Sequence, residues 1–129
     1  MGHEPIPAEH ERIALEVIGA AIEVHRLLGP GFLEKIYERA LIHELACRGI
    51  PVQPQKEIMV PYKDILIPGQ QLDLLAAERV ILELKSVNEL IPIHQAQILS
   101  YLKATGLRLG LLINFNVHVL KDGIKRVVR

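Results

Sequence analysis

One stretch of the chain, residues 70–86, alternates apolar and polar side chains with a period of two. Its even positions from 72 to 76 and from 80 to 84 are aliphatic, whereas Asp73, Glu83 and Lys85 occupy odd positions. A period of two is typical of β-strands, because successive side chains point to opposite faces of the sheet. The stretch therefore predicts two strands, about 70–76 and 80–86, with an aliphatic face and a face that carries chemistry or meets water.

The register of these two strands follows from the same alternation. A three-residue turn at 77–79 pairs Asp73 with Glu83, whereas a two-residue turn would set Asp73 opposite Leu82 and mix the two faces. Directly opposed Cβ atoms lie about 5 Å apart, so two carboxylates there repel unless a divalent cation or a shared proton lies between them. The alternative is a solvated face on which Lys85 neutralises the acids.

The rest of the sequence predicts a layered α/β domain. Apolar residues at helical spacing predict three helices, at 8–28, 32–48 and 91–105, with Leu33 and Ile36 of the second facing inward. Other strands are predicted at 56–62, 65–68, 109–114, 116–120 and 124–128, of which the last two are expected to form a hairpin. We expect one domain over 1–129, with a flexible N-terminus at 1–8.

Composition restricts the class of protein. Fifteen basic and fifteen acidic residues give a formal net charge of zero, which counts against binding nucleic acid by bulk charge. No apolar run is long enough to span a membrane, and the single Cys47 can form no disulfide within the chain, so we expect a cytoplasmic location. The first helix has more apolar positions than one face needs, including Ile18 and Ile22, which predicts a homodimer or larger assembly.

Two helices offer side chains that could complete a site. Glu34 and Tyr37 share one helical face, and His94, Gln97 and Tyr101 share another. Glu34 lies in the first turn of its helix, where the helix dipole favours a carboxylate. The structural alternatives are that Glu34 caps its own helix, that Tyr37 and Tyr101 belong to the core, and that Gln97 lies at the boundary.

Taken together, these residues resemble the PD-(D/E)XK nuclease superfamily. An Asp on one strand, Glu83-Leu84-Lys85 on the next and a helix with Gln97-x-x-x-Tyr101 follow an acidic helix residue in that order. The segment from Gly31 to Tyr37, GFLEKIY, further resembles the signature of the small bacterial GxxExxY proteins. The Pro-Asp of the superfamily name is not matched, since Leu72 precedes Asp73.

The resemblance implies a restriction-endonuclease-like αβββαβ core, a central mixed β-sheet flanked by helices. It implies Asp73, Glu83 and the Leu84 carbonyl as ligands of Mg²⁺ or Mn²⁺, with Lys85 activating water or stabilising the phosphate. It further implies Glu34 as a supporting acid and the residues on the two helices as support for the site or the substrate: Tyr37, His94, Gln97 and Tyr101. The expected function is metal-dependent hydrolysis of DNA or RNA. The alternative is a non-catalytic nuclease-fold module that binds nucleic acid or a partner protein.

Overall fold

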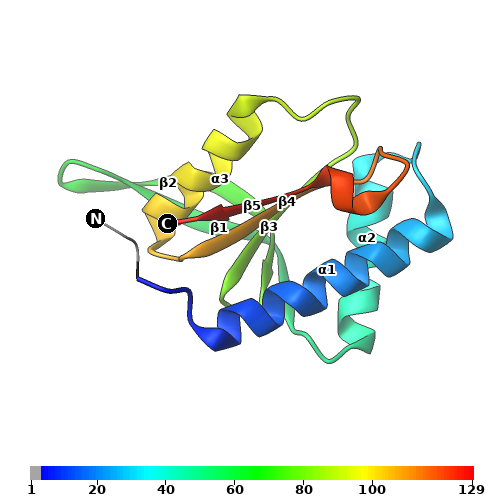
Figure 1. Cartoon of the computed structure of the whole chain (residues 1–129). Helices are drawn as coiled ribbons and strands as arrows, with labels where there is room; N and C mark the ends of the chain where they lie inside the picture. The colour runs from blue at the N-terminus through cyan, green and yellow to red at the C-terminus, as the bar shows by residue number, and fades with distance from the viewer. Residues whose placement is uncertain (1–3) are drawn as a thin grey trace.

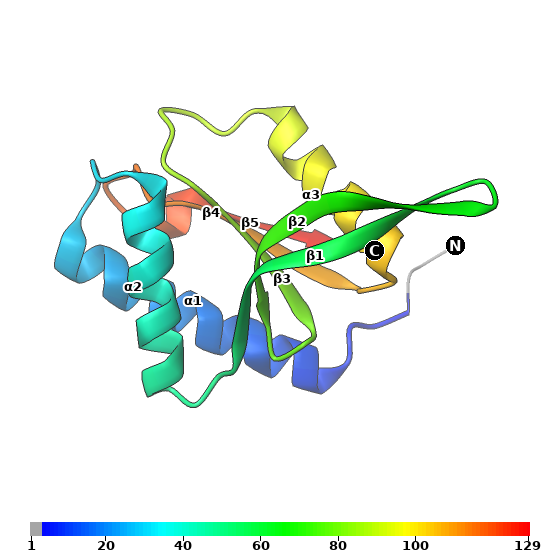
Figure 2. The same cartoon turned by 180° about the vertical axis from the view of Figure 1, so that it is seen from behind.

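A five-stranded mixed sheet, covered by helices on both faces, forms the centre of the computed structural model, which describes residues 4–129 (Figures 1 and 2). The elements in chain order are α1 (Ala8–Leu28), α2 (Glu34–Cys47), β1 (Val52–Tyr62), β2 (Ile65–Ala76), β3 (Val80–Lys85), α3 (Pro92–Thr105), β4 (Leu109–Asn114), the 3₁₀ helix η1 (Leu120–Gly123) and β5 (Ile124–Val128). The expected fold class is confirmed. Among the described residues, no helix is both long and apolar enough to cross a membrane.

The strands lie in the order β1-β2-β3-β4-β5. Three of the four neighbouring pairs are antiparallel, and only β3 and β4 run parallel. A parallel pair needs a crossover connection, and α3 supplies it between β3 and β4. Because α3 crosses one face, α1 and α2 are left to cover the other.

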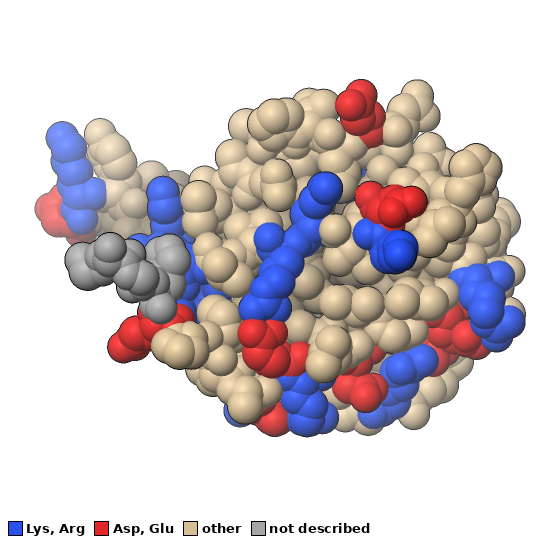
Figure 3. Space-filling view, viewed as in Figure 1, with Lys and Arg blue, Asp and Glu red and all other residues tan. Residues whose placement is uncertain are grey.

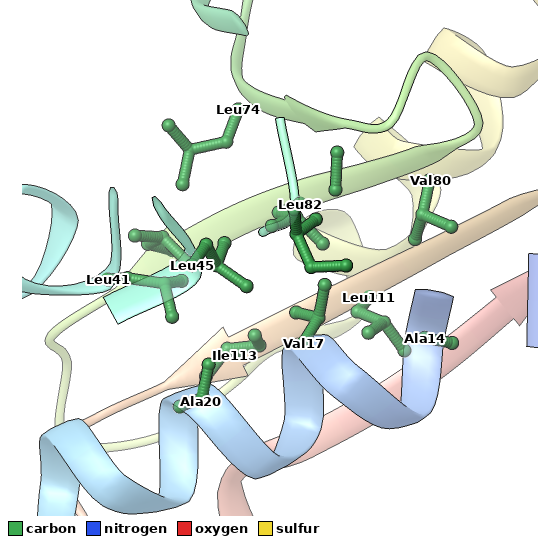
Figure 4. Packing of buried hydrophobic residues seen from close by; sticks show 14 of the residues in the cluster. Ala14, Val17, Ala20, Leu41, Leu45, Leu74, Val80, Leu82, Leu111 and Ile113 are labelled. Carbon is green, nitrogen blue, oxygen red and sulfur yellow. The ribbon is translucent and has the colours of Figure 1, made fainter. Parts of the chain in front are cut away.

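The larger core lies between the sheet and α1 and α2. Ala14, Val17 and Ala20 of α1 face the sheet, where Leu82 and Leu111 are fully or almost fully buried (Figure 4). Small residues on α1 let the helix approach the strands closely, and Leu41 and Leu45 of α2 complete this side (Figure 4). The aliphatic face expected for β2 and β3 is the face that packs here.

A second core lies under α3. Leu75 of β2 and Ile81 of β3 occupy odd positions, and both are buried against Ile98 and Leu102 of α3. The face with the odd-numbered residues is therefore covered by α3 for part of its length. The expectation that this whole face carries chemistry or meets water is wrong for that part. A strand at the centre of a sheet with helices on both sides is apolar on both faces.

The expected register between β2 and β3 is confirmed. The pairs Leu74–Leu82 and Ala76–Val80 continue the alignment that brings Asp73 towards Glu83. Leu72 is placed differently from the sequence expectation, because it packs in the α3 core and not with Leu74. Gln55 of β1, which faces the Asp73 position, has a left-handed φ of 51°, and the β1–β2 ribbon twists here.

Several sequence predictions need correction. The runs 65–68 and 70–76 form one strand, because a β-bulge between Ile67 and Gln70 absorbs Pro68 and Gly69. Helix α2 starts at Glu34, so Leu33 is the capping residue before it and Ile36 lies in its first turn; they are 78% and 43% exposed instead of facing inward.

The expected C-terminal hairpin is also wrong. Residues 116–119 form no strand, and β5 pairs with the free edge of β4, from Leu109–Val128 to Ile113–Ile124. The turn residues form η1, which packs so closely on the end of β4 that a Cβ on Gly123 would lie 2.2 Å from the Asn114 carbonyl oxygen. Pairing with β4 satisfies the backbone groups of β5 that a local hairpin would otherwise satisfy.

The N-terminal segment expected to be flexible, residues 1–8, includes residues 1–3, which lie outside the described residues. Over the described part, Arg108 donates a hydrogen bond of 2.6 Å to the Glu4 carbonyl oxygen, and Ile6 packs against the larger core. Helix α1 already begins at Ala8. Residues 4–8 are thus attached to the body at two points and then enter the helix.

Close packing of α3 on β4 predicts the effect of one methyl group. A Cβ on Gly110 would lie 2.5 Å from Ile98 Cγ2, so Gly110→Ala should lower the free energy of unfolding by about 1–3 kcal/mol. The control is Gly19→Ala inside α1, where only the flexible Arg48 side chain is near; it should be neutral or stabilise by about 0.5–1 kcal/mol. Chemical denaturation of both variants checks this, and equal effects would contradict the packing described.

Candidate active site

Two carboxylates lie where the backbone ladder between β2 and β3 ends. The last paired residues there are Leu74 and Leu82. Beyond them, Glu83 Oε2 accepts a hydrogen bond of 2.8 Å from the Asp73 backbone N–H, and Asp73 Oδ2 accepts one of 2.9 Å from the Leu84 N–H. Each acid therefore bonds to the opposite strand, and both are held in the opening between the two strands.

The surroundings of these acids favour their protonated forms. Burial and the negative charge of Asp73 raise the pKa of Glu83 to about 8, although the Asp73 N–H and the Lys85 charge act in the opposite direction. Burial likewise raises the pKa of Asp73, against the hydrogen bond from Leu84 and the charge of Lys85. At neutral pH, the positive charge and hydrogen-bond donors of the protein alone thus compensate the negative charge of this pair poorly. Such a perturbed pair is typical of a functional site.

Glu34 and Lys85 lie within electrostatic range of the two acids. Burial raises the pKa of Glu34, the charge of Asp73 raises it further, and the Lys85 ammonium lowers it. Glu34 is the first residue of α2, and Lys85 is the last of β3. The end of one strand and the start of a distant helix therefore bring their charges to the same region.

A cleft of about 500 Å³ opens beside these acids. Lys85, His94, Gln97 and Tyr101, which the sequence singled out, line it, together with Gln70, Ile93, Ala96 and Ser100. Asp73 and Glu83 are not on the lining, but burial and then the negative charges of Glu83 and Asp73 raise the pKa of the Tyr101 phenol. The acids thus lie within electrostatic range of the cleft wall.

Gln70 is a cleft residue that the sequence reasoning missed. Its side-chain amide donates a hydrogen bond of 2.8 Å to the Tyr101 hydroxyl, which joins β2 to α3 across the cleft. The alternation alone places Gln70 on the face of Leu74, away from α3. The twist beside Asp73 moves it to the α3 side, and a period of two contains no signal for such a twist.

Tyr37 lies away from the cleft, in the larger core. Its hydroxyl donates to the Gly29 carbonyl at 2.6 Å and accepts from the Phe32 N–H at 3.1 Å, while its ring stacks on Phe115. The Phe32 carbonyl in turn accepts a hydrogen bond of 2.7 Å from the Ser86 hydroxyl. Tyr37 thus fixes the loop that leads into Glu34, and the hydrogen bond from Ser86 ties that loop to the residue after Lys85.

His94 has a structural task as well as a place in the cleft. Its Nδ1 accepts a hydrogen bond of 3.2 Å from the backbone N–H of Ile91, which caps the start of α3. No other hydrogen bond to its imidazole is present in the described part of the chain. The cap orients the ring, and the second ring nitrogen is available to the cleft.

Comparison with known proteins decides the family. The family model of the PD-(D/E)XK nuclease superfamily matches residues 11–127, which is most of the chain. The chain belongs to the PD-(D/E)XK nuclease superfamily. Its mixed sheet with flanking helices is consistent with the restriction-endonuclease-like fold of that superfamily. No curated protein and no solved structure matches the chain.

The two central acids of this superfamily member suit a hard divalent cation. Each uses one oxygen for a backbone N–H, and neither Asp73 Oδ1 nor Glu83 Oε1 has a hydrogen bond within the described residues. Among residues 4–129, no three His, Cys, Asp or Glu side chains gather closely enough to hold a metal ion. The two carboxylates thus offer two oxygens without hydrogen bonds, which are the kind of ligand that hard divalent cations prefer.

The buried acids predict how stability depends on pH in the metal-free protein. Folded Glu83 keeps its proton up to about pH 8, whereas unfolded Glu83 releases it near 4.5, so the folded state binds more protons in this window. The free energy of unfolding should therefore fall as pH rises from 4.5 to 8, by on the order of a few kcal/mol. Glu83→Gln should remove much of this fall and keep an acceptor for the Asp73 N–H.

Urea denaturation between pH 4.5 and 8, with a chelator present, measures this dependence. Glu57→Gln, on the exposed part of β1, is the matched control and should behave like the wild type. An unchanged pH dependence in Glu83→Gln would show that another group causes it.

Proposed function

We propose that this protein is a metal-dependent nuclease that hydrolyses phosphodiester bonds of DNA or RNA. The observation that carries the proposal is the pair of crossed carboxylates, Asp73 and Glu83, poorly compensated and beside a cleft that Lys85 lines. Membership of a superfamily whose members usually hydrolyse nucleic acids supports it. The closer GxxExxY assignment, carried by residues 31–37, and a cytoplasmic location stay predictions.

Asp73, Glu83 and the Leu84 carbonyl would hold Mg²⁺ or Mn²⁺. A bound divalent cation lowers the pKa of water and stabilises negative charge that develops on a phosphate. The carboxylates contribute two negative charges to such an ion. Their mutual repulsion, which burial strengthens, favours binding a cation over remaining ionised without one.

Other side chains would act directly on the substrate. The Lys85 ammonium, on the cleft lining, would orient the attacking water or contact the phosphate. Gln97 and Tyr101 on α3 would hold the substrate, and Gln70 would keep the Tyr101 hydroxyl in place. His94 offers one further donor or acceptor, Glu34 would add a supporting negative charge, and Tyr37 would act as a positioning residue for Glu34.

The second candidate function is a non-catalytic nuclease-fold module that binds nucleic acid or a partner protein. Zero net charge favours it, and on the face seen in Figure 3 basic and acidic side chains are interspersed instead of forming a broad basic field. Substrate binding would then depend on the cleft and on a partner more than on bulk charge. Retention of the opposed acids beside Lys85 favours the catalytic function, because a binding module has no need to bury them.

Removal of one proposed metal ligand should abolish metal-induced stabilisation. Mn²⁺ should raise the melting temperature of the wild type by mass action, and more strongly as pH rises and the acids lose protons. Asp73→Asn should lose this shift and, without metal, should melt at the same or a slightly higher temperature because a repulsion is relieved. Thermal melting with and without Mn²⁺ checks this, and equal shifts in both proteins would show that Asp73 is no ligand.

Replacement of the proposed catalytic cation should separate binding from turnover. Lys85→Ala should retain the Mn²⁺-induced melting shift and lose cleavage by about 10²-fold or more, since a group that acts on the reacting phosphate or water is removed. Lys103→Ala, at the exposed end of α3, is the control and should cleave normally. The assay uses labelled single- and double-stranded DNA and RNA. Metal binding without cleavage of any substrate by the wild type would favour the binding module.

A further inference from the structure

The outer part of the β1–β2 ribbon forms an arm that extends away from the body of the protein (Figures 1 and 2). We call residues 59–68 the arm. It exposes six large apolar side chains by 37–60%: Met59, Val60, Tyr62, Ile65, Leu66 and Ile67. A monomer rarely exposes so many neighbouring apolar groups, and such a patch typically marks an interaction site.

Four of these side chains form one continuous face. Val60 pairs directly with Ile67, and Tyr62 pairs with Ile65, so all four point to the same side of the ribbon. Along β1, this face continues from Ile58, which is only 6% exposed because it packs in the α3 core. The apolar face that α3 covers thus extends past the helix, and its outer part stays exposed, with the Lys63 ammonium over the Tyr62 ring at its end.

The edges of the arm are closed to strand addition, although its faces are open. In a hairpin with a two-residue turn, the residues beside the turn bond to each other, so the next pair, Pro61 and Leu66, directs its backbone groups outward. Pro61 has no N–H to offer there, and Pro68 has none on the other edge. The arm is therefore built to pack through a face and not to extend a sheet.

The charges at the two ends of the arm indicate what packs on it. The middle of the apolar face, formed by Val60, Tyr62, Ile65 and Ile67, carries no charged residue, which disfavours a nucleic-acid phosphate as its occupant. At the tip lie Asp64 and Lys63, whose ammonium lies over the Tyr62 ring. At the base, Lys56 lies on the apolar face, whereas its neighbour Glu57 points to the opposite face. If two arms lie antiparallel, Asp64 at the tip of one meets Lys56 at the base of the other, and a chain of zero net charge does not repel its copy.

We propose that the arm is a dimerisation element, whose apolar face packs on the same face of a second copy with the two arms antiparallel. An alignment that sets Asp64 of one copy near Lys56 of the other is centred on Val60, in the middle of the apolar face. Lys56 lies on this face, since it precedes Ile58 and Val60 at two-residue steps. The contact is isologous, so it closes at two copies.

Sedimentation equilibrium of the full chain between about 1 and 100 μM tests the proposal. The wild type should form a dimer, and Ile65→Asp on the arm should weaken association at least about tenfold. Ile22→Asp is the matched control, because Ile22 is similarly exposed (46%) on the outer side of α1 and belongs to the helix that the sequence alone suggested as the interface. Circular dichroism establishes that each variant is folded.

A charge exchange makes the test specific for an antiparallel pair of identical arms. Asp64→Lys should weaken the dimer, because a lysine at position 64 of one copy then meets Lys56 of the other. Adding Lys56→Glu in the same chain should restore the dimer, because the lysine at position 64 then meets a glutamate at position 56 of the other copy. A wild type that stays monomeric at 100 μM, a dimer that Ile22→Asp and not Ile65→Asp disrupts, or a charge exchange that does not restore association would overturn the proposal.

Discussion

The crossed hydrogen bonds of Asp73 and Glu83 are the constraint on which the rest of the site depends. Antiparallel strands normally exchange backbone hydrogen bonds at every second residue pair, but here carboxylate oxygens act as the acceptors for the N–H groups of Asp73 and Leu84. The strands remain joined while they separate enough to hold two acidic side chains. A substitution that shortens either acid would therefore disturb the sheet as well as the chemistry, whereas an isosteric amide keeps an acceptor in place.

Two cores of unequal size hold this opening in place. On one side, α1 and α2 bury the aliphatic face of β2 to β4, and on the other α3 buries Leu75 and Ile81 immediately beside the acids. Glu83 is only 4% exposed, and the protein does not fully compensate the charge of its carboxylate. The free energy gained from the apolar burial in the two cores offsets this cost. The two cores thus anchor the sheet on both of its faces around the buried acid.

The order of elements and the register of β2 against β3 could be predicted from the sequence, because a period of two and the length of the 77–79 turn depend on local geometry alone. The position of Gln70, the exposure of Leu33 and the partner of β5 could not. Each depends on contacts between distant segments. The position of Gln70 depends on the twist of β2 opposite Gln55, the exposure of Leu33 depends on where α2 begins, and the pairing of β5 depends on the free edge of β4. The sequence pattern identified the acids and Lys85, but only the structure shows that a cleft lies beside them.

The same twist also gives the candidate site and the arm a common origin. Strand β2 is 12 residues long, and only its last three residues pair with β3. Where β2 leaves β3, Asp73 gains the space that its carboxylate and Glu83 occupy, and the outer half of the strand loses its neighbour on that side. Because β1 stays paired with β2, a two-stranded ribbon leaves the body, and the apolar side chains on one of its faces remain exposed. A chain that opens its sheet to hold two buried acids thus exposes an apolar surface a few residues further along the same strand.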